Sequence, residues 1–416
     1  MTAHIEAAPG DGLVSAPVIR QHWLFLPLFT PFGISSGYVS VTLAFILGKM
    51  GLPVAVVGTL VALSVWPQTW KILWAPIVDT TGNPKLWYGL GALLTGGTIW
   101  WMSAIHATNA SIPLLSVLIV VSSIASTFVS MSTEIFMAHY VPKEAQGAAS
   151  GWGQAGNLGG GGIGGGLGLV LYAHIPVPWV SGLALALICF ACWAFVALLP
   201  PAPRGHRDER YLTSLLNVVR DVWGVARSRL GYLALIIMVL PVASGGASGL
   251  WSAIAGEWRA GADLVAVATG VASGLVSAAG CLAGGYICDR MDNKAAYALF
   301  GIVVGIAAVL MAVTPRTPAM FAVWTLAYAL AIGAGYAAYN AIVLEAIGKG
   351  AAATKFNLMA ALSNIPIAAM TQFDGWVHDT YGTNAMLYVE LWLPALTLAL
   401  FALFVWATKP RRAKPA

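Results

Sequence analysis

Two charged side chains stand inside stretches of this sequence that are otherwise strongly apolar. Lys71 lies in "QTWKILWAPIVD", and Glu134 lies in "STEIFMAHY". If these stretches cross a membrane, each charge costs at least about 2.5–3.5 kcal/mol on insertion scales, so each residue is first treated as a site candidate. An ammonium group can hold the negative group of a solute, and a carboxylate can take up and release a proton.

Lys71 and Glu134 stand at equal distances from signals that end a helix. Lys71 precedes Asp79, the first loop signal, by eight residues, and Glu134 precedes the helix breaker Pro142 by eight. Eight residues span about 12 Å of helix, so the two charges share a depth if both helices run in the same direction. We therefore predict an ion pair that faces a cavity. In the alternative that the sequence leaves open, Lys71 snorkels to the headgroups with its stem packed between tryptophans.

Polar residues in the middle of other apolar stretches form a second group of candidates. Such side chains can hydrogen-bond a solute in a wet cavity, or they can join helices to one another, and the sequence leaves both alternatives open. Tyrosine and asparagine together in mid-span favour the wet cavity. The candidate site for substrate binding and coupling consists of Lys71, Trp74, Glu134, Gln154, Asn157, Tyr336, Tyr339, Asn340, Glu345 and Asn364.

The other acidic residues are assigned by their position along the apolar stretches. Glu345 is either a protonatable coupling site or a solvated helix end, because it lies close to the loop at Gly348. Glu390 lies deep in the last apolar stretch and receives no assignment. The acids near predicted outer helix ends, which we expect to be entrance or loop residues, are Glu257, Asp374 and Asp379.

The composition indicates which elements must position these residues. The chain has 416 residues, of which 59% are hydrophobic and 9% are charged, with a mean hydropathy of +0.79. Soluble domains carry about 25% charged residues, so the composition indicates an integral membrane protein. Apolar units of about 20 residues match the thickness of the hydrocarbon core. Because a transmembrane barrel would instead alternate in hydrophobicity, the spanning elements are predicted to be helices.

Twelve spans are predicted, which gives an all-α membrane protein. Two of them are irregular: the seventh is interrupted by "SGGASG" from Ser244, and the eleventh carries several polar residues. The predicted spans are 22–48, 54–77, 86–106, 112–138, 147–172, 178–199, 231–256, 264–286, 295–313, 318–346, 353–373 and 384–407.

The long connection after the sixth span divides the chain into two halves. It opens with "PPAPRGHRDER", which is polar, basic and rich in proline. The predicted domains are a tail at 1–21, a six-helix bundle at 22–199, a linker at 200–230, a second six-helix bundle at 231–407 and a basic tail at 408–416.

The basic residues give the expected orientation. Apart from Lys71, only Lys49, Arg259 and Arg316 of the 21 Lys and Arg residues fall on one side of the predicted spans. Because basic loops stay in the cytoplasm, we expect the other side and both termini there, in the inner membrane of a bacterial cell. The net charge of +5 reflects this asymmetry, and we expect no nucleic-acid partner.

The two halves repeat one another in sequence. Asp79 in "APIVDTTGNPKLWYGLG" corresponds to Asp289 in "GGYICDRMDNKAAYALFG", and Asn157 corresponds to Asn364. Parallel six-helix repeats around a central cavity are one common plan of transporters. We therefore expect two pseudo-symmetric six-helix bundles.

The segment "GGYICDRMDNK" resembles the loop between the second and third helices in each half of the major facilitator superfamily. The resemblance covers almost the whole chain and implies the major facilitator fold. It also implies that Asp79, Asp289 and Arg290 are loop residues that act in the conformational change. A carboxylate there can cap a helix start or pair with a neighbouring arginine, and we expect one of these contacts for Asp289.

Three further segments carry a narrower resemblance. "KILWAPIVD", "STEIFMAHYVPKEAQGAASGWGQAGNLGGG" and "AATKFNLMAALSN" resemble the AmpG-type muropeptide permeases, which share a branch with acetyl-coenzyme A transporters and some siderophore permeases. Lys71, Trp74, Pro76 and Asp79 match the second-helix motif of this branch, and Glu134 stands where the branch usually has Asp. The resemblance implies a medium-sized solute with anionic or amide groups.

These observations predict a secondary active transporter with proton-coupled uptake of a polar or anionic solute, such as a muropeptide, a siderophore or an acyl-coenzyme-like molecule. A drug or metabolite exporter of the same fold and a transport-dead membrane sensor remain alternatives. We expect no enzyme, because no H-E-x-x-H motif or clustered histidines are present, and the chain carries no Walker motif for ATP. The expected partners are the solute, protons and the lipid bilayer. We expect a monomer without metal, cofactor or catalytic residues.

Overall fold

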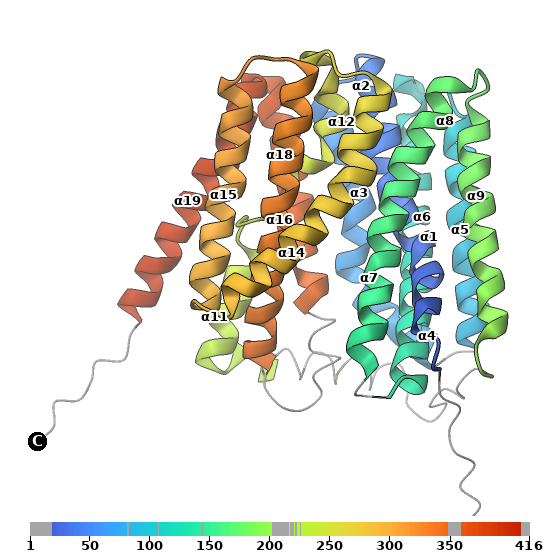
Figure 1. The fold of residues 1–416 in the computed structure, drawn as a ribbon, viewed down its shortest axis with the longest axis horizontal. Coiled ribbons are helices and arrows are strands. Elements are labelled where there is room, and N and C mark those ends of the chain that lie inside the picture. Colours follow the sequence, from blue (N-terminus) through green and yellow to red (C-terminus); the bar gives the residue numbers. More distant parts are fainter. Residues whose placement is uncertain are drawn as a thin grey trace, which may run out of the picture.

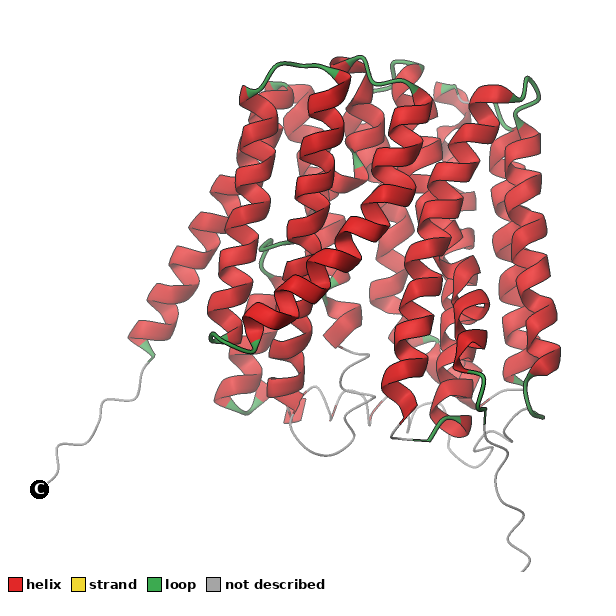
Figure 2. Cartoon of the chain, in the orientation of Figure 1, coloured by secondary structure: helices red, strands yellow, loops and turns green. Residues whose placement is uncertain are grey.

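The computed structural model describes residues 19–80, 83–106, 108–142, 145–201, 226–347 and 359–408, together with 216, 220, 223 and 224. In this part of the chain the regular elements are all helices, as Figure 2 shows. Most of the helices lie side by side along one direction (Figure 1). Seven of the described helices are long and apolar enough to cross a membrane, judged by length and composition.

The first half contains six helical passes, in the order expected from the sequence. Several passes change helix type partway, through π-helical or 3₁₀ turns. The elements are α1 (Phe25–Gly37), a π-helical turn (Tyr38–Leu43) and α2 (Ala44–Lys49) in the first pass; α3 (Val54–Trp70), a 3₁₀ turn (Lys71–Leu73) and α4 (Ala75–Thr80) in the second; α5 (Pro84–Ala104); α6 (Ile112–Tyr140); α7 (Gln146–Gly162), a π-helical turn (Ile163–Leu167) and α8 (Gly168–His174) in the fifth; and α9 (Trp179–Ala194).

The second half repeats this arrangement with six more passes. Its elements are α11 (Arg229–Val239), a 3₁₀ turn (Gly246–Gly249), α12 (Trp251–Ile254) and a 3₁₀ turn (Ala255–Trp258) in the seventh pass; α13 (Ala262–Val265), a π-helical turn (Ala266–Val271) and α14 (Ala272–Cys288) in the eighth; α15 (Asn293–Val313); α16 (Pro318–Ile347); α18 (Asn364–Tyr381); and α19 (Thr383–Ala407). The described part of the first pass begins, and that of the last pass ends, on the lower side in Figure 1, which agrees with an even number of crossings.

The seventh pass is interrupted where the sequence predicted. After Val239 the chain leaves the helix, and Ala243 and Gly245 adopt positive φ angles of 48° and 72°. Glycine tolerates this left-handed conformation because it has no Cβ, which explains the break at "SGGASG". The break lies inside the bundle and therefore frees backbone groups that can bind side chains.

The eleventh pass differs from its predicted bounds. It was expected to end at residue 373, but α18 continues to Tyr381. The continuation is "DGWVHDTY", whose two acids were expected near an outer helix end. His378 and Asp379 bind neighbouring elements, whereas Asp374 lies fully buried inside the bundle.

The loop before α15 also corrects a prediction. Asp289 was expected to cap a helix start or to pair with an arginine, but Asp292 is the residue that caps α15, accepting hydrogen bonds from two backbone N–H groups of its first turn at 3.1 and 3.0 Å. The guanidinium of Arg290 lies over the ring of Tyr286, with its Cζ 3.4 Å from the ring centroid. Asp289 directly follows the last residue of α14, Cys288.

Glycines of the fifth pass allow α7 to pack closely against α1. A Cβ added to Gly156 would lie 2.1 Å from the carbonyl oxygen of Leu26, and one added to Gly160 would lie 2.3 Å from that of Thr30. Small residues let two membrane helices touch through their backbones. The glycine-rich segment thus has a packing role in this conformation.

We expect Gly156→Ala to lower the melting temperature, because the new methyl group would overpack the α1–α7 contact at a cost of about 1–3 kcal/mol. Gly159→Ala is the matched control: it lies on the same helix, and a Cβ there meets nothing within 4 Å. Thermal unfolding of the two purified variants measures the difference. Equal melting temperatures would contradict the close α1–α7 contact.

The two halves contact each other mainly toward one end of the bundle. The contacting elements are α3 with α18, α2 with α12, α8 with α13, and the π-helical turns of the fifth and eighth passes with each other. The labels of α2, α8 and α12 lie at the upper end in Figure 1, opposite the end at which the described chain begins and ends. This conformation is therefore closed between the halves at the end that carries Lys49 and Arg259, which the sequence predicts to be the outer end.

Candidate functional site

The predicted contact between Lys71 and Glu134 is confirmed. Lys71 Nζ lies 3.6 Å from Glu134 Oε1. The side chains are 19% and 31% exposed, so the pair is partly open. Lys71 also stands where the helix changes: α3 ends at Trp70, and the 3₁₀ turn begins at Lys71.

Neighbouring hydrogen bonds hold the second pass against α6 at this position. The indole Nε1 of Trp74 donates to Thr127 Oγ1 at 2.9 Å, and Ser123 Oγ donates to the carbonyl oxygen of Ser64 at 2.6 Å. Both contacts join the second pass to α6 within about three turns of Glu134, so they hold the two passes together close to the ion pair.

Gln154 and Asn157 lie one turn apart on α7 and bind each other. Asn157 Nδ2 donates to Gln154 Oε1 at 3.3 Å. Gln154 is exposed and Asn157 is half-buried. The two candidates on α7 are therefore in contact with each other.

The tyrosine candidates of the tenth pass line a cavity, whereas the asparagine candidates of the tenth and eleventh passes do not contribute to its lining. Tyr336 and Tyr339 line a cavity of about 20 Å³, which has room for one water molecule. The hydroxyl of Tyr339 donates to the carbonyl oxygen of Met359 at 2.7 Å. Asn340 is exposed, and the amide of Asn364 donates to a backbone carbonyl of the preceding turn at 3.2 Å.

Glu345 lies at the end of α16 and forms an ion pair with Lys294, which belongs to the first turn of α15. The Nζ–Oε1 distance is 3.0 Å, and the side chains are partly exposed. Of the two alternatives that the sequence left open for Glu345, this position supports the solvated helix end. Asp79 belongs to α4, and its side chain lies outside the described part of the structure.

A pair of buried carboxyl groups was not predicted from the sequence. Asp374 was expected near an outer helix end, but it is fully buried, and Glu390 is 2% exposed. Glu390 accepts a hydrogen bond from the Tyr328 hydroxyl at 2.5 Å and another from the backbone N–H of Ala247 at 3.2 Å. A Cβ added to Gly246, the residue before Ala247, would lie 2.9 Å from Asp374 Oδ2, so both carboxyls lie beside the same short stretch of backbone. The only sequence signal was the isolation of Glu390 in an apolar stretch.

A polar cavity of about 170 Å³ lies between the halves, beside this pair. Hydroxyl groups from the first, seventh, eighth and tenth passes contribute to its lining. Sequence analysis missed these residues because short hydroxyl side chains are common in membrane helices and give no pattern of their own. The polar residues that line the cavity include Ser40, Ser248, Thr269, Ser273, Ser277 and Tyr328.

Charged residues at the outer end form a network that joins the halves. Glu257 contacts Arg316 at 2.6 Å and His378 at 2.8 Å, and His378 contacts Asp379 at 3.0 Å. Asp379 accepts hydrogen bonds from the backbone N–H groups of Val54 and its neighbour at 3.0 and 2.8 Å, where α3 begins. Asp379 thus caps a helix of the first half from the second half.

Two six-helix halves with a polar cavity between them are one common plan of membrane transporters. Residues 25–371 match the model of the Major Facilitator Superfamily, and the chain belongs to this family. It is therefore a multi-pass membrane transporter and not an enzyme.

Solved transporters share the fold at low sequence identity. The nucleoside transporter NupG is 13% identical with a TM-score of 0.70, covering 94% of this chain and 100% of its own. A bacterial homologue of the human lysosomal transporter Spinster, inward-facing and unoccupied, is 14% identical with a TM-score of 0.69 and coverages of 95% and 100%. The xylose transporter XylE from E. coli, partially occluded and inward open, is 14% identical with a TM-score of 0.64 and coverages of 95% and 100%. No curated protein matches the chain.

Proposed function

We propose that this transporter takes up a medium-sized polar or anionic solute together with protons, across the inner membrane of a bacterial cell and with both termini in the cytoplasm. The observation that carries the proposal is the Lys71–Glu134 ion pair, which is partly open and stands at a change of helix type in the second pass. In this proposal the protein acts as a monomer, and Asp79, Asp289 and Arg290 serve as loop residues in the conformational change.

The pair offers a simple means of coupling. A solute carboxylate or phosphate that binds Lys71 competes with Glu134 for the same ammonium group. Without the contact to Lys71 the Glu134 carboxylate is less stabilised, so in this proposal it takes a proton from hydronium, forms an O–H bond and leaves a water molecule. Solute binding and proton binding then support each other.

The resemblance to AmpG-type permeases supports a muropeptide, a siderophore or an acyl-coenzyme-like molecule as the solute. The solved structures of similar fold include a nucleoside transporter, a xylose transporter and a peptide-bound member of the POT family, whose solutes are also polar. Lys71 favours an anion among such molecules. An exporter of the same fold or a sensor without transport would use the same cavity.

A ligand screen tests the solute class. A ligand that binds only the folded protein raises its melting temperature by mass action. We expect at least one compound from a panel of muropeptides, siderophores and coenzyme A esters to raise the melting temperature of the wild type, and to have a smaller effect on Lys71→Met. A panel without any such compound would contradict the proposed solute class. Uptake by intact cells compared with everted vesicles then distinguishes import from export.

The proposed orientation has its own test. Because most basic residues lie on the side of the termini, a single cysteine at Gly205 should react with an impermeant thiol reagent only from the cytoplasm. A cysteine at Thr108 should react only from outside. The reverse labelling would contradict the orientation and, with it, the depth assigned to Lys71.

A further inference from the structure

The buried carboxyl groups of Asp374 and Glu390 have no role in the mechanism above. Asp374 lies on α18 and Glu390 on α19, each within the bundle. Among the described residues, no lysine, arginine or histidine forms an ion pair with either group. The titratable groups that face the pair are the two carboxyls themselves and the Tyr328 hydroxyl of α16.

The hydrogen bonds make the two carboxyls unequal. Both oxygens of Glu390 accept hydrogen bonds, one from Tyr328 and one from the backbone of Ala247, and such bonds stabilise a carboxylate. Both oxygens of Asp374 are buried without a hydrogen-bond partner among the described residues. Two adjacent carboxylates without a cation are strongly unfavourable in a dry interior, so the pair must hold a proton, and Asp374 is the group that needs it.

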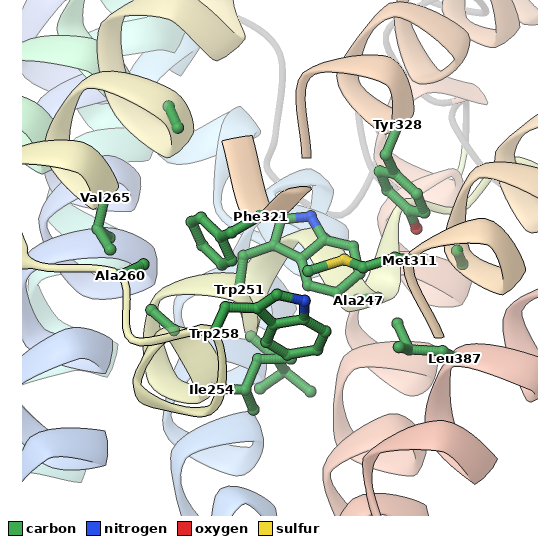
Figure 3. Close-up of a cluster of buried hydrophobic side chains, with 14 of the residues drawn as sticks. Ala247, Trp251, Ile254, Trp258, Ala260, Val265, Met311, Phe321, Tyr328 and Leu387 are labelled. Carbon is green, nitrogen blue, oxygen red and sulfur yellow. The ribbon is translucent and has the colours of Figure 1, made fainter. Parts of the chain in front are cut away.

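The pair has a connection to the polar cavity between the halves. Tyr328 lines this cavity and reaches Glu390 with its hydroxyl. Trp251 lines the same cavity, and its buried indole N–H has no hydrogen-bond partner in the described structure, which leaves a donor for a water molecule. The rings of Trp251 and Tyr328 meet edge to face, with centroids 5.2 Å apart; both are labelled in Figure 3. A cavity of about 170 Å³ is large enough for several water molecules.

The pair also contacts the parts that close the outer side. A Cβ on Gly246, at the break of the seventh pass, would lie 2.9 Å from Asp374 Oδ2. The next residue along α18, Gly375, packs against α3 of the other half, where an added Cβ would lie 2.8 Å from the carbonyl oxygen of Val54. A negative charge on Asp374 in addition to that on Glu390 would therefore destabilise the contact between α18 and α3, which closes the outer side.

We infer that Asp374 and Glu390 form a proton-binding site, reached through Tyr328 from the polar cavity between the halves, whose occupation stabilises the outward-closed conformation. Binding moves a proton from hydronium to a carboxylate oxygen of Asp374, forms an O–H bond there and leaves a water molecule. This inference deepens the proposed proton-coupled uptake and rests on it for its role in transport. The site itself can be tested without any solute.

Infrared spectroscopy of the purified protein tests the proton directly. The wild type should show a carboxylic-acid C=O band at neutral pH that disappears on alkalinisation, and aspartate labelled with ¹³C in its side-chain carboxyl should shift this band. Asp374→Asn should abolish it, whereas Asp263→Asn should leave it, because Asp263 is an exposed acid beside His174. The isotope measurement needs no substitution, so a variant that fails to fold leaves the test intact. The inference would be overturned if the band is missing. It would also be overturned if only labelled glutamate shifts the band, or if sodium and not pH controls it.

Transport measurements separate this inference from the proposed function. In proteoliposomes with a coenzyme A ester or a muropeptide as the probe, Asp374→Asn should lose pH-driven accumulation but retain counterflow, since exchange of solute needs no change of protonation. Normal pH-driven accumulation by this variant would overturn the role of the pair while leaving proton-coupled uptake in place. If the infrared band behaves as expected but the wild type shows no pH-driven uptake, the proposed function is contradicted. The proton-binding site is then still supported.

Discussion

Lys71→Met and Glu134→Gln should each reduce the initial rate of concentrative uptake by at least about tenfold, because a contact to a charged group contributes about 1.5–3 kcal/mol. The two variants should differ in counterflow, the exchange of solute across the membrane. Glu134→Gln should retain counterflow, since exchange of solute does not require proton movement, whereas Lys71→Met should lose it together with solute binding. Uptake and counterflow in proteoliposomes measure both properties.

The double variant Lys71→Met/Glu134→Gln provides the structural check. The pair is partly exposed, so each single substitution should change the free energy of unfolding by only about 0–1 kcal/mol. The double variant should be more stable than the sum of the single effects implies, because the residues touch, but its transport should not recover. A matched control is Lys294→Met/Glu345→Gln, which removes the other lysine–glutamate ion pair at a helix end and should preserve transport. Normal uptake by Lys71→Met would contradict the proposed site.

Asp379→Ala should shift the protein away from its outward-closed conformation. Asp379 accepts two hydrogen bonds from the start of α3 in the opposite half. Loss of a helix cap costs about 1 kcal/mol, so the ratio of closed to open molecules should fall about fivefold. Spin labels at Ala110 and Gly261, on the outer ends of the two halves, should show a larger fraction of long distances by pulsed electron resonance.

The exposed acid Asp263 gives the control for this second prediction. It lies near the outer end, where its contact is with His174 and where both side chains are more than half exposed. Asp263→Ala should leave the distance distribution of the spin labels unchanged. If Asp379→Ala also leaves it unchanged, the cap at α3 does not contribute to outer closure.

The sequence was sufficient to predict the fold and the contact between Lys71 and Glu134. Apolar stretches of spanning length indicate the passes, and the equal spacing of the two charges from helix-ending residues places them at one depth. Both signals are local to a helix and are measured along it. Both signals remain valid in the folded protein because backbone groups inside the membrane must be hydrogen-bonded, which keeps the chain helical.

Contacts that leave no signal along their own helices could not be predicted. The polar sequence around Asp374 is typical of a loop, but Thr371, His378 and Asp379 bind other elements, and the segment is helical. In the loop before α15, Asp289 and Asp292 are equally able to cap, and the exact helix start selects Asp292. The ion pair between Glu345 and Lys294 likewise depends on the packing of α15 against α16.

Solute accumulation under an imposed pH gradient tests the central claim most directly. Proteoliposomes with the protein inserted in its proposed orientation would receive a gradient that is acidic on the outer side and labelled members of the muropeptide, siderophore and coenzyme A ester panel. We expect at least one anionic solute to accumulate, and a protonophore or Lys71→Met to abolish its accumulation. If no solute of the panel accumulates, or if accumulation persists without the gradient or without Lys71, then proton-coupled uptake through the Lys71–Glu134 site is contradicted.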